Sequence, residues 1–204
     1  MDGQLMISID RFIAPSSAPE EWHAARKEGV TATTVGKAAT PGGFKDVINA
    51  IENPQPFEDN DYMRFGREQE IPIMLEVKRQ YGVLPNDWLI AAEDLDWHLA
   101  TPDGLSLDHS RIAEVKTTGR DFGTFKGIPI HYRRQVQWQL HVTGAHECVF
   151  AWMLRVPSGG YFQPGWLEPK FLVIERDEAE IAKLIEVAHN LRMHEVYKSQ
   201  MKGN

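Results

Sequence analysis

The stretch "TPDGLSLDHSRIAEVKTTG", residues 101–119, places a Pro-Asp-Gly turn eleven residues ahead of a strand-like segment that contains Glu114 and Lys116. Side chains two residues apart in a strand lie on the same face, so Glu114 and Lys116 project together while Val115 points the other way, into the core. From Asp103 the chain returns through one strand, which allows Asp103 and Glu114 to reach neighbouring positions in a sheet. We therefore expect Asp103, Glu114 and Lys116 to form one site.

These residue types suit metal-dependent hydrolysis of a phosphodiester. Carboxylates hold a hard divalent cation, which polarises the phosphoryl oxygen and lowers the pKa of a bound water. Asp103 and Glu114 are the candidate ligands, and Lys116 would add a positive charge near the attacking water and the transition-state charge. An ordinary turn is the competing interpretation of Asp103, because Pro, Asp and Gly are common turn residues.

The tripeptide Glu-x-Lys alone indicates little, because it occurs three times, at 76–78, 114–116 and 168–170. The first copy lies in a predicted helix, where residues two apart point about 200° away from each other. Glu76 and Lys78 are therefore expected to lie on a solvated helix face. The third copy contains a proline, which favours a loop. Only the copy at 114–116 has the strand context that brings both charges to one face.

Outward from this stretch, apolar spacing and capping residues predict alternating helices and strands. A long helix over 62–81, capped by Asn60 or Asp61, should bury a stripe of Met63, Ile71, Met74 and Val77. The other expected elements are helices over 19–28 and 32–39 (capped by Thr31 or Thr33), an antiparallel meander of strands over 87–92, 96–100, 104–108 and 111–117, a helix in "HYRRQVQWQLHVTG" ending at Gly144, strands in "CVFAWMLRV" and "KFLVIE", and a final helix over 177–199.

Bulk composition predicts one domain over residues 1–204, since 204 residues with 42% hydrophobic content can bury one substantial core. The start of the chain lacks a targeting pattern, and the longest apolar run is too short to cross a bilayer, so we expect a cytoplasmic protein without a membrane partner. The single cysteine, Cys148, excludes an internal disulfide and has apolar neighbours, which predicts a buried thiol.

Net charge taken alone argues against a nucleic-acid partner, because it is −7. Its distribution is uneven. Residues 111–134 hold six Lys or Arg against two acids, which allows one basic surface, although a solvated mixed surface explains the pattern equally well.

Five motifs follow one another along the chain: "EEWHAARKEGVTATTVGKAA", "FGREQE", "ATPDGL", "AEVKTT" and "YRRQVQWQLHVTG". In this order they resemble the motifs of the phage lambda exonuclease family of viral recombination nucleases, and the later "VIERDE" also fits. The resemblance runs from about Trp22 to Asp177. It implies an α/β PD-(D/E)XK core, a central mixed sheet flanked by helices, with Mg²⁺ as cofactor and Mn²⁺ as a substitute. It also implies 5′ to 3′ digestion of one strand of duplex DNA from an end, a ring-shaped homotrimer, and contact with a single-strand annealing protein in the cytoplasm of a bacterial host.

Carried over motif by motif, the resemblance gives individual residues a role. Glu70, rather than the competing Glu68, would be the helix carboxylate that faces the metal site, and Gln135 would help to position the water or the scissile phosphate. The backbone carbonyl of Val115 would join Asp103 and Glu114 as a metal ligand. Arg26 and Thr33 would match the residues that bind the terminal 5′-phosphate.

This sequence departs from the family pattern at two places, and neither departure removes a ligand. Thr117 and Thr118 follow the lysine where Cys-Pro is frequent, and Thr33 stands where serine is common.

Alternatives remain at this point. The same core could belong to a repair or restriction endonuclease, or the chain could be a non-catalytic module that binds DNA ends. Histidine spacing gives little support for a zinc site. Tyr132 and Trp138 could stack on bases, but core packing is the more common role of aromatics at helical spacing, and Met63 is more easily explained by packing than as a wedge between bases.

Overall fold

The computed structural model describes residues 6–56 and 58–202, with side chains as far as residue 194, and these contain two β-sheets. The larger sheet has six strands in the order β10-β8-β7-β6-β3, with β9 paired to β8. Its strands are β3 (Val83–Pro85), β6 (Gly104–Ser106), β7 (Arg111–Thr118), β8 (Glu147–Ser158), β9 (Tyr161–Pro164) and β10 (Lys170–Glu175). Strands β7 and β8 run parallel, whereas their other partners run antiparallel. A parallel pair needs a crossover, and helix α5 (Ile130–Thr143) provides it.

The smaller sheet has the order β1-β4-β5-β2. Its strands are β1 (Phe12–Pro15), β2 (Val30–Thr31), β4 (Trp88–Ala91) and β5 (His98–Ala100). The predicted single meander is therefore wrong, because β4 and β5 lie in one sheet while β6 and β7 lie in the other. Both edges of the β4–β5 pair are already occupied, by β1 and by β2, so β5 has no free edge for β6.

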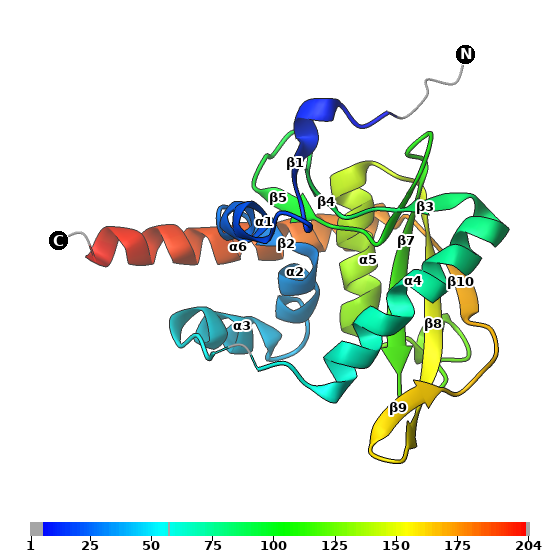
Figure 1. Cartoon of the computed structure of the whole chain (residues 1–204). Helices are drawn as coiled ribbons and strands as arrows, with labels where there is room; N and C mark the ends of the chain where they lie inside the picture. Colours follow the sequence, from blue (N-terminus) through cyan, green and yellow to red (C-terminus); the bar gives the residue numbers. More distant parts are fainter. Residues whose placement is uncertain (1–5, 57, 203–204) are drawn as a thin grey trace.

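Helices α4 and α5 cover opposite faces of the larger sheet. Val115 packs with Ile73 and Val77 of α4 (Asp61–Tyr81), whereas Ile112 packs in the cluster that contains Val136 of α5. In Figure 1, α4 crosses in front of β7 and β8, and α5 stands between this sheet and the smaller one. The alternation along β7 therefore sends Val115 toward α4, as predicted, and its neighbours Glu114 and Lys116 toward the α5 side.

Most predicted elements are present. The remaining helices are η1 (Ile9–Arg11), α1 (Pro19–Lys27), α2 (Ala32–Ala38), α3 (Gly43–Glu52), η2 (Phe125–Gly127) and α6 (Glu178–Lys202). Asn60 caps α4 by accepting a hydrogen bond from the Met63 amide at 3.0 Å, and Gly144 ends α5 in the left-handed conformation at φ 78°. Helix α3 and strands β1, β2, β3 and β9 were not predicted. The four strands have only two to four residues, too few to show a period, whereas the apolar residues of α3 do repeat at helical spacing (Phe44, Val47, Ile48 and Ile51) and could have identified it.

The predicted buried stripe of α4 is half wrong. Met74 and Val77 are buried, but Met63 is 43% exposed and Ile71 is 71% exposed. At 100° per residue, Ile71 lies about 200° from the buried Ile73 and so faces solvent. Cys148 is fully buried, which confirms the predicted buried thiol.

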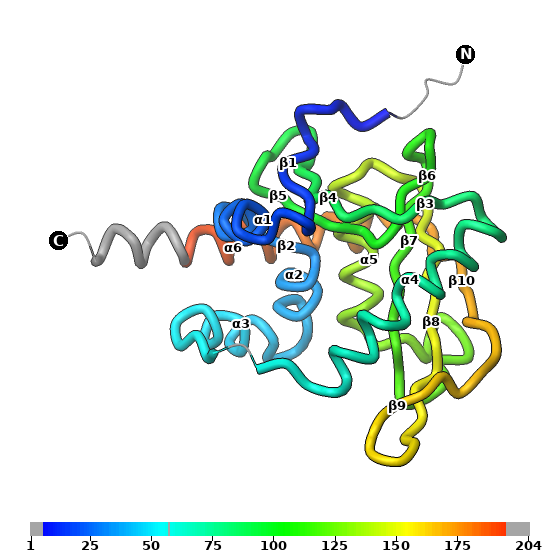
Figure 2. The backbone as a smooth tube through the Cα atoms, viewed as in Figure 1, coloured from blue at the N-terminus to red at the C-terminus, as the bar shows by residue number. Residues whose placement is uncertain are grey.

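The hairpin of β8 and β9 lies beside the first turns of α4, as the backbone trace in Figure 2 shows. Phe162 of β9 stacks on Tyr62 with ring centroids 5.0 Å apart and meets the buried Phe65 edge-on. None of the helices in the described residues combines the length and the apolar composition that a bilayer crossing requires.

Candidate active site

A cleft of about 540 Å³ opens between α4, β7 and the start of α5, and we call it the Lys116 cleft. It is lined by Tyr62, Met63, Gly66, Arg67, Glu70, Asp103, Val115, Lys116, Thr117, Tyr132 and Arg155. Three of the residues expected to share a site, Glu70, Asp103 and Lys116, therefore meet here although the sequence separates them by up to 46 positions.

Asp103 is held at the cleft by the strand next to it. Its Oδ2 accepts a hydrogen bond from the backbone N–H of Val115 at 2.6 Å, which joins the turn to β7. Burial raises the pKa of Asp103 well above its ordinary value, and the nearby Glu114 carboxylate raises it further, whereas Lys116 lowers it. A carboxylate in this position is costly to ionise without a cation beside it.

Glu114 lies beneath the cleft rather than on its wall. Its side chain is almost fully buried, and its oxygens accept hydrogen bonds at 2.6 Å from both Gln135 Nε2 and Gln139 Nε2. It also forms an ion pair with Lys116. Two amide donors and one ammonium group fix the orientation of this carboxylate.

Lys116 stays charged in this setting. Burial by itself would lower the pKa of Lys116, but Glu114 and Asp103 together outweigh burial and raise the pKa above its ordinary value. The Nζ atom also lies 5.1 Å from the centre of the Tyr132 ring, which is close enough for a cation–π contact. The cleft thus holds a permanent positive charge next to its carboxylates.

Glu70 approaches from α4 and remains accessible to solvent at the cleft. Partial desolvation raises the pKa of Glu70, as does the charge of Glu114, while Lys116 opposes both. The competing carboxylate, Glu68, is exposed and does not line the cleft.

The donor set fits a divalent cation that also binds a substrate. Among residues 6–56 and 58–194, no group of three or more His, Cys, Asp or Glu side chains is arranged to hold a metal ion by itself. Mg²⁺ seldom requires such a cage, because it commonly uses one or two carboxylates and completes its shell with water and phosphate oxygens. Burial, and then the charges of Glu114 and Glu70, raise the pKa of Asp103, and a cation bound beside these carboxylates would relieve their repulsion.

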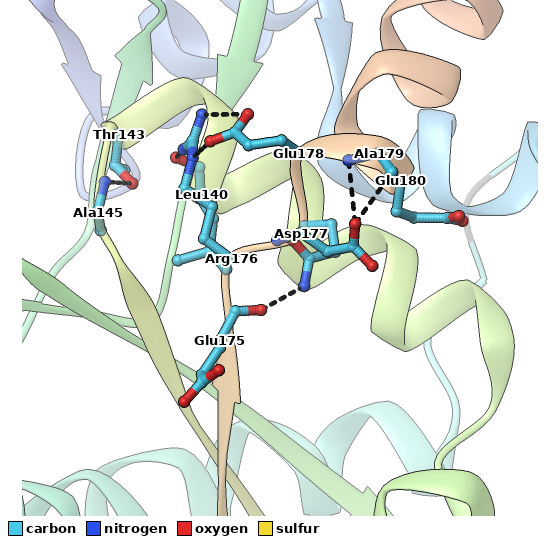
Figure 3. Close-up of polar contacts among 10 residues, drawn as sticks. Leu140, Thr143, Ala145, Glu175, Arg176, Asp177, Glu178, Ala179 and Glu180 are labelled. Carbon is cyan, nitrogen blue, oxygen red and sulfur yellow. Dashed lines mark hydrogen bonds and ion pairs between the residues drawn. The ribbon is translucent and has the colours of Figure 1, made fainter.

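Helix α5, which provides Gln135 and Gln139, is anchored to the segment 173–178. The Gln137 side chain donates to the carbonyl of Glu175 and accepts from the amide of Asp177, both at 2.8 Å. Arg176 donates to the carbonyl of Leu140 at 2.5 Å. Figure 3 shows this junction and the Asp177 carboxylate that caps the start of α6. The "VIERDE" motif therefore positions the helix behind the cleft.

The structure places Arg26 and Thr33 in a different pocket, of about 520 Å³, which we call the Arg26 pocket. Its polar lining consists of Arg26, Lys27, Thr31, Thr33, Thr34 and Lys37. The guanidinium of Arg26 lies 4.2 Å from the centre of the Trp22 ring, and desolvation lowers the pKa of Arg26. Helix α2 separates this pocket from α5, and the two helices pack so closely that a side chain at Gly36 would meet the carbonyl of His131 at 2.6 Å.

Sequence reasoning missed several residues of the site. Gln139 follows Gln135 by one helical turn, so helix spacing alone could have identified it. Tyr132 had been considered only for stacking or packing, but it lies at the cleft, whereas Trp138 is fully buried, as its core role predicted. Nothing in the sequence pointed to Arg155, because only the β7–β8 pairing brings it to Thr117.

Comparison with known proteins places the chain among recombination nucleases. A family model described as the YqaJ-like viral recombinase domain matches residues 21–146. The crystal structure of an alkaline exonuclease (LHK-Exo) from Laribacter hongkongensis is 27% identical, with a TM-score of 0.67 over 90% of this chain and 96% of that chain. The same enzyme in complex with dAMP gives a TM-score of 0.68 at 26% identity, over the same shares of both chains.

A phage related exonuclease from Haemophilus somnus 129PT has the same fold, with a TM-score of 0.66 at 16% identity over 85% of this chain and 96% of that chain. No curated protein sequence gives a match. The predicted fold class, a mixed α/β fold with helices flanking a mixed sheet, is confirmed, and it is consistent with a PD-(D/E)XK-like core. The chain therefore belongs to the YqaJ-like viral recombinase family, and it is an exonuclease related to the phage lambda exonuclease family.

Proposed function

We propose that the protein is a Mg²⁺-dependent exodeoxyribonuclease that degrades one strand of linear duplex DNA in the 5′ to 3′ direction. The remaining 3′ single-stranded tail would serve strand-annealing recombination. The observation that supports this most is the meeting of Glu70, Asp103 and a charged Lys116 in one open cleft.

Each candidate residue in and beneath the cleft has a proposed part. Asp103, Glu114 and the carbonyl of Val115 would hold Mg²⁺, with Mn²⁺ able to replace it. The bound ion would polarise the phosphoryl oxygen and activate a water. Lys116 donates to the phosphate oxygen on which charge develops, and Glu70 faces the same space from α4. Gln135 and Gln139 fix the orientation of the Glu114 side chain by donating to its two oxygens, so Gln135 acts through that residue.

The proposed polarity depends on the Arg26 pocket. An arginine offers two parallel N–H groups to one phosphate, and the neighbouring hydroxyl of Thr33 adds a further donor. A 5′-terminal phosphate bound there would orient the strand before cleavage in the cleft. The complex of LHK-Exo with dAMP supports this class of substrate, since dAMP is a deoxynucleoside monophosphate.

We further propose a homotrimer that encloses DNA ends, and contact with a single-strand annealing protein in the cytoplasm of a bacterial host. Enclosure would sustain progressive degradation, and a closed ring of identical subunits is a common arrangement. Sedimentation at working concentration tests the assembly. A trimer is expected, and a monomer would remove this explanation of processive digestion.

The central experiment compares linear duplex, closed circular duplex and single-stranded DNA, each with Mg²⁺ or with EDTA. We expect Mg²⁺-dependent loss of linear duplex with release of mononucleotides and no cutting of closed circles. Cutting of closed circles would favour an endonuclease on the same core. Binding of ends without degradation under any metal condition would favour a non-catalytic end-binding module.

A further inference from the structure

Arg155 lies at the rim of the Lys116 cleft and has no role in the chemistry described so far. It follows Leu154, the last residue of β8 that pairs with β7, and it begins the β8–β9 hairpin opposite Pro164. Its side chain reaches back over the end of β7, where Nη1 lies 3.5 Å from the Thr117 hydroxyl.

Aromatic packing fixes the position of this guanidinium. Its carbon lies 4.4 Å from the centre of the Tyr62 ring and 5.1 Å from that of Phe162. These two rings stack on each other with planes 30° apart, and Phe65, which is 3% exposed, supports Phe162 from below. An arginine held against two rings loses little further side-chain freedom when a ligand binds.

Arg155 differs from the other cations that line the cleft. Arg67 forms a two-point ion pair with Asp59, at 3.0 and 2.5 Å, and Lys116 is paired with Glu114. Within residues 6–56 and 58–194, Arg155 has no ion pair, and Thr117 is its only hydrogen-bond acceptor. Most of its five N–H donors therefore remain free beside a site that is otherwise rich in carboxylates.

We infer that Arg155 binds a backbone phosphate of the DNA strand adjacent to the scissile phosphate, with Tyr62 and Phe162 as the platform that aims it. This inference rests on the proposed function, because it places the substrate strand in the Lys116 cleft. A phosphate matches the free donors in geometry and charge, since the planar guanidinium offers parallel N–H groups. The positive charge of Arg155 would also lower the repulsion that the carboxylates of the cleft exert on an incoming anionic strand.

Arg155 is assigned to binding rather than to the chemical step, because Lys116 already supplies the charge next to Asp103 and Glu70. Its loss should therefore weaken DNA binding more than it slows cleavage of bound DNA. A purely structural arginine, which only packs the hairpin onto α4, would change thermal stability and leave the salt dependence of binding unchanged.

The test measures binding of a fluorescent duplex with a 5′-phosphorylated end by anisotropy, in EDTA, over a range of salt concentrations. The Arg155→Gln variant should bind about 10-fold or more weakly, as expected for one charged hydrogen-bonded contact. The slope of log K against log salt should become shallower by about one, because one fewer phosphate is neutralised. Arg155→Lys should keep most of the salt slope while losing part of the affinity, since the charge remains but the fork does not.

Two control variants sharpen the result. Arg67→Gln changes a cation of the same cleft that Asp59 already neutralises, and Arg79→Gln changes one that pairs with Glu76 and does not line the cleft. Both should bind nearly as wild type does. Unchanged affinity and slope in a folded Arg155→Gln protein would overturn the inference, as would an equal loss in Arg67→Gln, which would indicate diffuse attraction.

The outcome is separable from the proposed function. Binding in EDTA is read without cleavage, so a wild-type protein that binds ends without degrading them would reject the proposed nuclease activity while leaving the Arg155 contact measurable. If Arg155→Gln unfolds, the Arg155→Lys comparison still decides, because loss of the salt slope in that variant would contradict a charge contact.

Discussion

The Lys116 cleft and the Arg26 pocket are similar in size, at about 540 and 520 Å³, but they differ in their acidic residues. Glu70 and Asp103 line the cleft together with cations that are mostly paired, whereas the described lining of the Arg26 pocket contains no acidic residue. A site that gathers carboxylates attracts metal ions, and a site that gathers cations and hydroxyls attracts phosphate. Under the proposed function, these two environments would hold different parts of one substrate end.

The two sites are separate, but a lysine from each of them acts on the same side chain, that of His131. Helix α2 packs directly on α5 between them. Burial lowers the pKa of His131 at the start of α5, and the charges of Lys37 of the Arg26 pocket and Lys116 of the cleft lower it further. Substitutions in either site should therefore have distinguishable effects.

The largest effect is expected at Asp103. Replacing Asp103 by Asn removes a proposed metal ligand but keeps an oxygen that can accept the Val115 amide. We expect kcat for linear duplex to fall by at least about 10³-fold, since loss of metal-assisted catalysis costs several kcal/mol at 1.36 kcal/mol per tenfold. Release of acid-soluble nucleotides measures it. Nuclease activity equal to that of wild type would remove Asp103 from the site.

The same variant has a predictable pH dependence of stability. The folded-state pKa of Asp103 is raised above its unfolded value, so wild type loses stability as pH rises through the folded pKa. Relative to wild type in EDTA, Asp103→Asn should therefore gain Tm as pH increases from about 4, the ordinary pKa of an aspartate. A Tm difference that does not change with pH would show that burial and crowding do not disfavour the charged form.

A smaller but still large effect is expected at Lys116. Lys116→Ala should slow single-turnover cleavage by about 10²–10³-fold while DNA binding changes little, because its charge acts on the transition state. Lys78→Ala is the matched control, since Lys78 ends the other Glu-Val-Lys copy, at 76–78, and is exposed on α4. Binding that weakens in proportion to turnover, with unchanged single-turnover chemistry, would make Lys116 a simple phosphate contact.

A substitution in the Arg26 pocket should change the preference for a 5′-phosphorylated end. Wild type is expected to prefer a 5′-phosphorylated duplex over a 5′-hydroxyl duplex, and Arg26→Ala should reduce that preference by about 10- to 100-fold, the value of one charged hydrogen bond. The ratio of initial rates on the two substrates measures it. An unchanged preference in a normally folded variant would return Arg26 to a role in packing on Trp22.

Sequence reasoning anticipated the cleft better than the sheets because the cleft residues lie in locally recognisable elements. Asp103 is the central residue of a Pro-Asp-Gly turn, and Glu114 and Lys116 share a strand face. Glu70, by contrast, was assigned to the site only through the resemblance to the phage lambda exonuclease family. The two-sheet arrangement depends instead on which strand edges are free, and that is decided by the two- to four-residue strands β1 and β2, which are too short to show a period.

Residues that a distant strand brings to the site were also beyond prediction. Arg155 reaches Thr117 only because β7 and β8 pair in parallel up to Thr118 and Leu154. Glu114 shows a related limit. Its position on the strand was predictable, but its orientation beneath the cleft depends on Gln135 and Gln139, which helix α5 presents to it on the face toward which Glu114 points.

The smallest predicted effect concerns Thr33, and it tests whether the Arg26 pocket binds through hydroxyl groups as well as charge. Thr33 is exposed in the pocket, whereas the hydroxyl of its neighbour Thr34 is 3.0 Å from that of Thr31. Thr33→Val keeps the shape and removes the hydroxyl, so a lost neutral hydrogen bond of about 0.5–1.5 kcal/mol should reduce the preference for a 5′-phosphate by about 2- to 10-fold. Thr33→Ser keeps the hydroxyl and should retain the wild-type ratio. Equal ratios in the valine and serine variants, with Arg26→Ala still impaired, would show that the pocket recognises phosphate by charge alone.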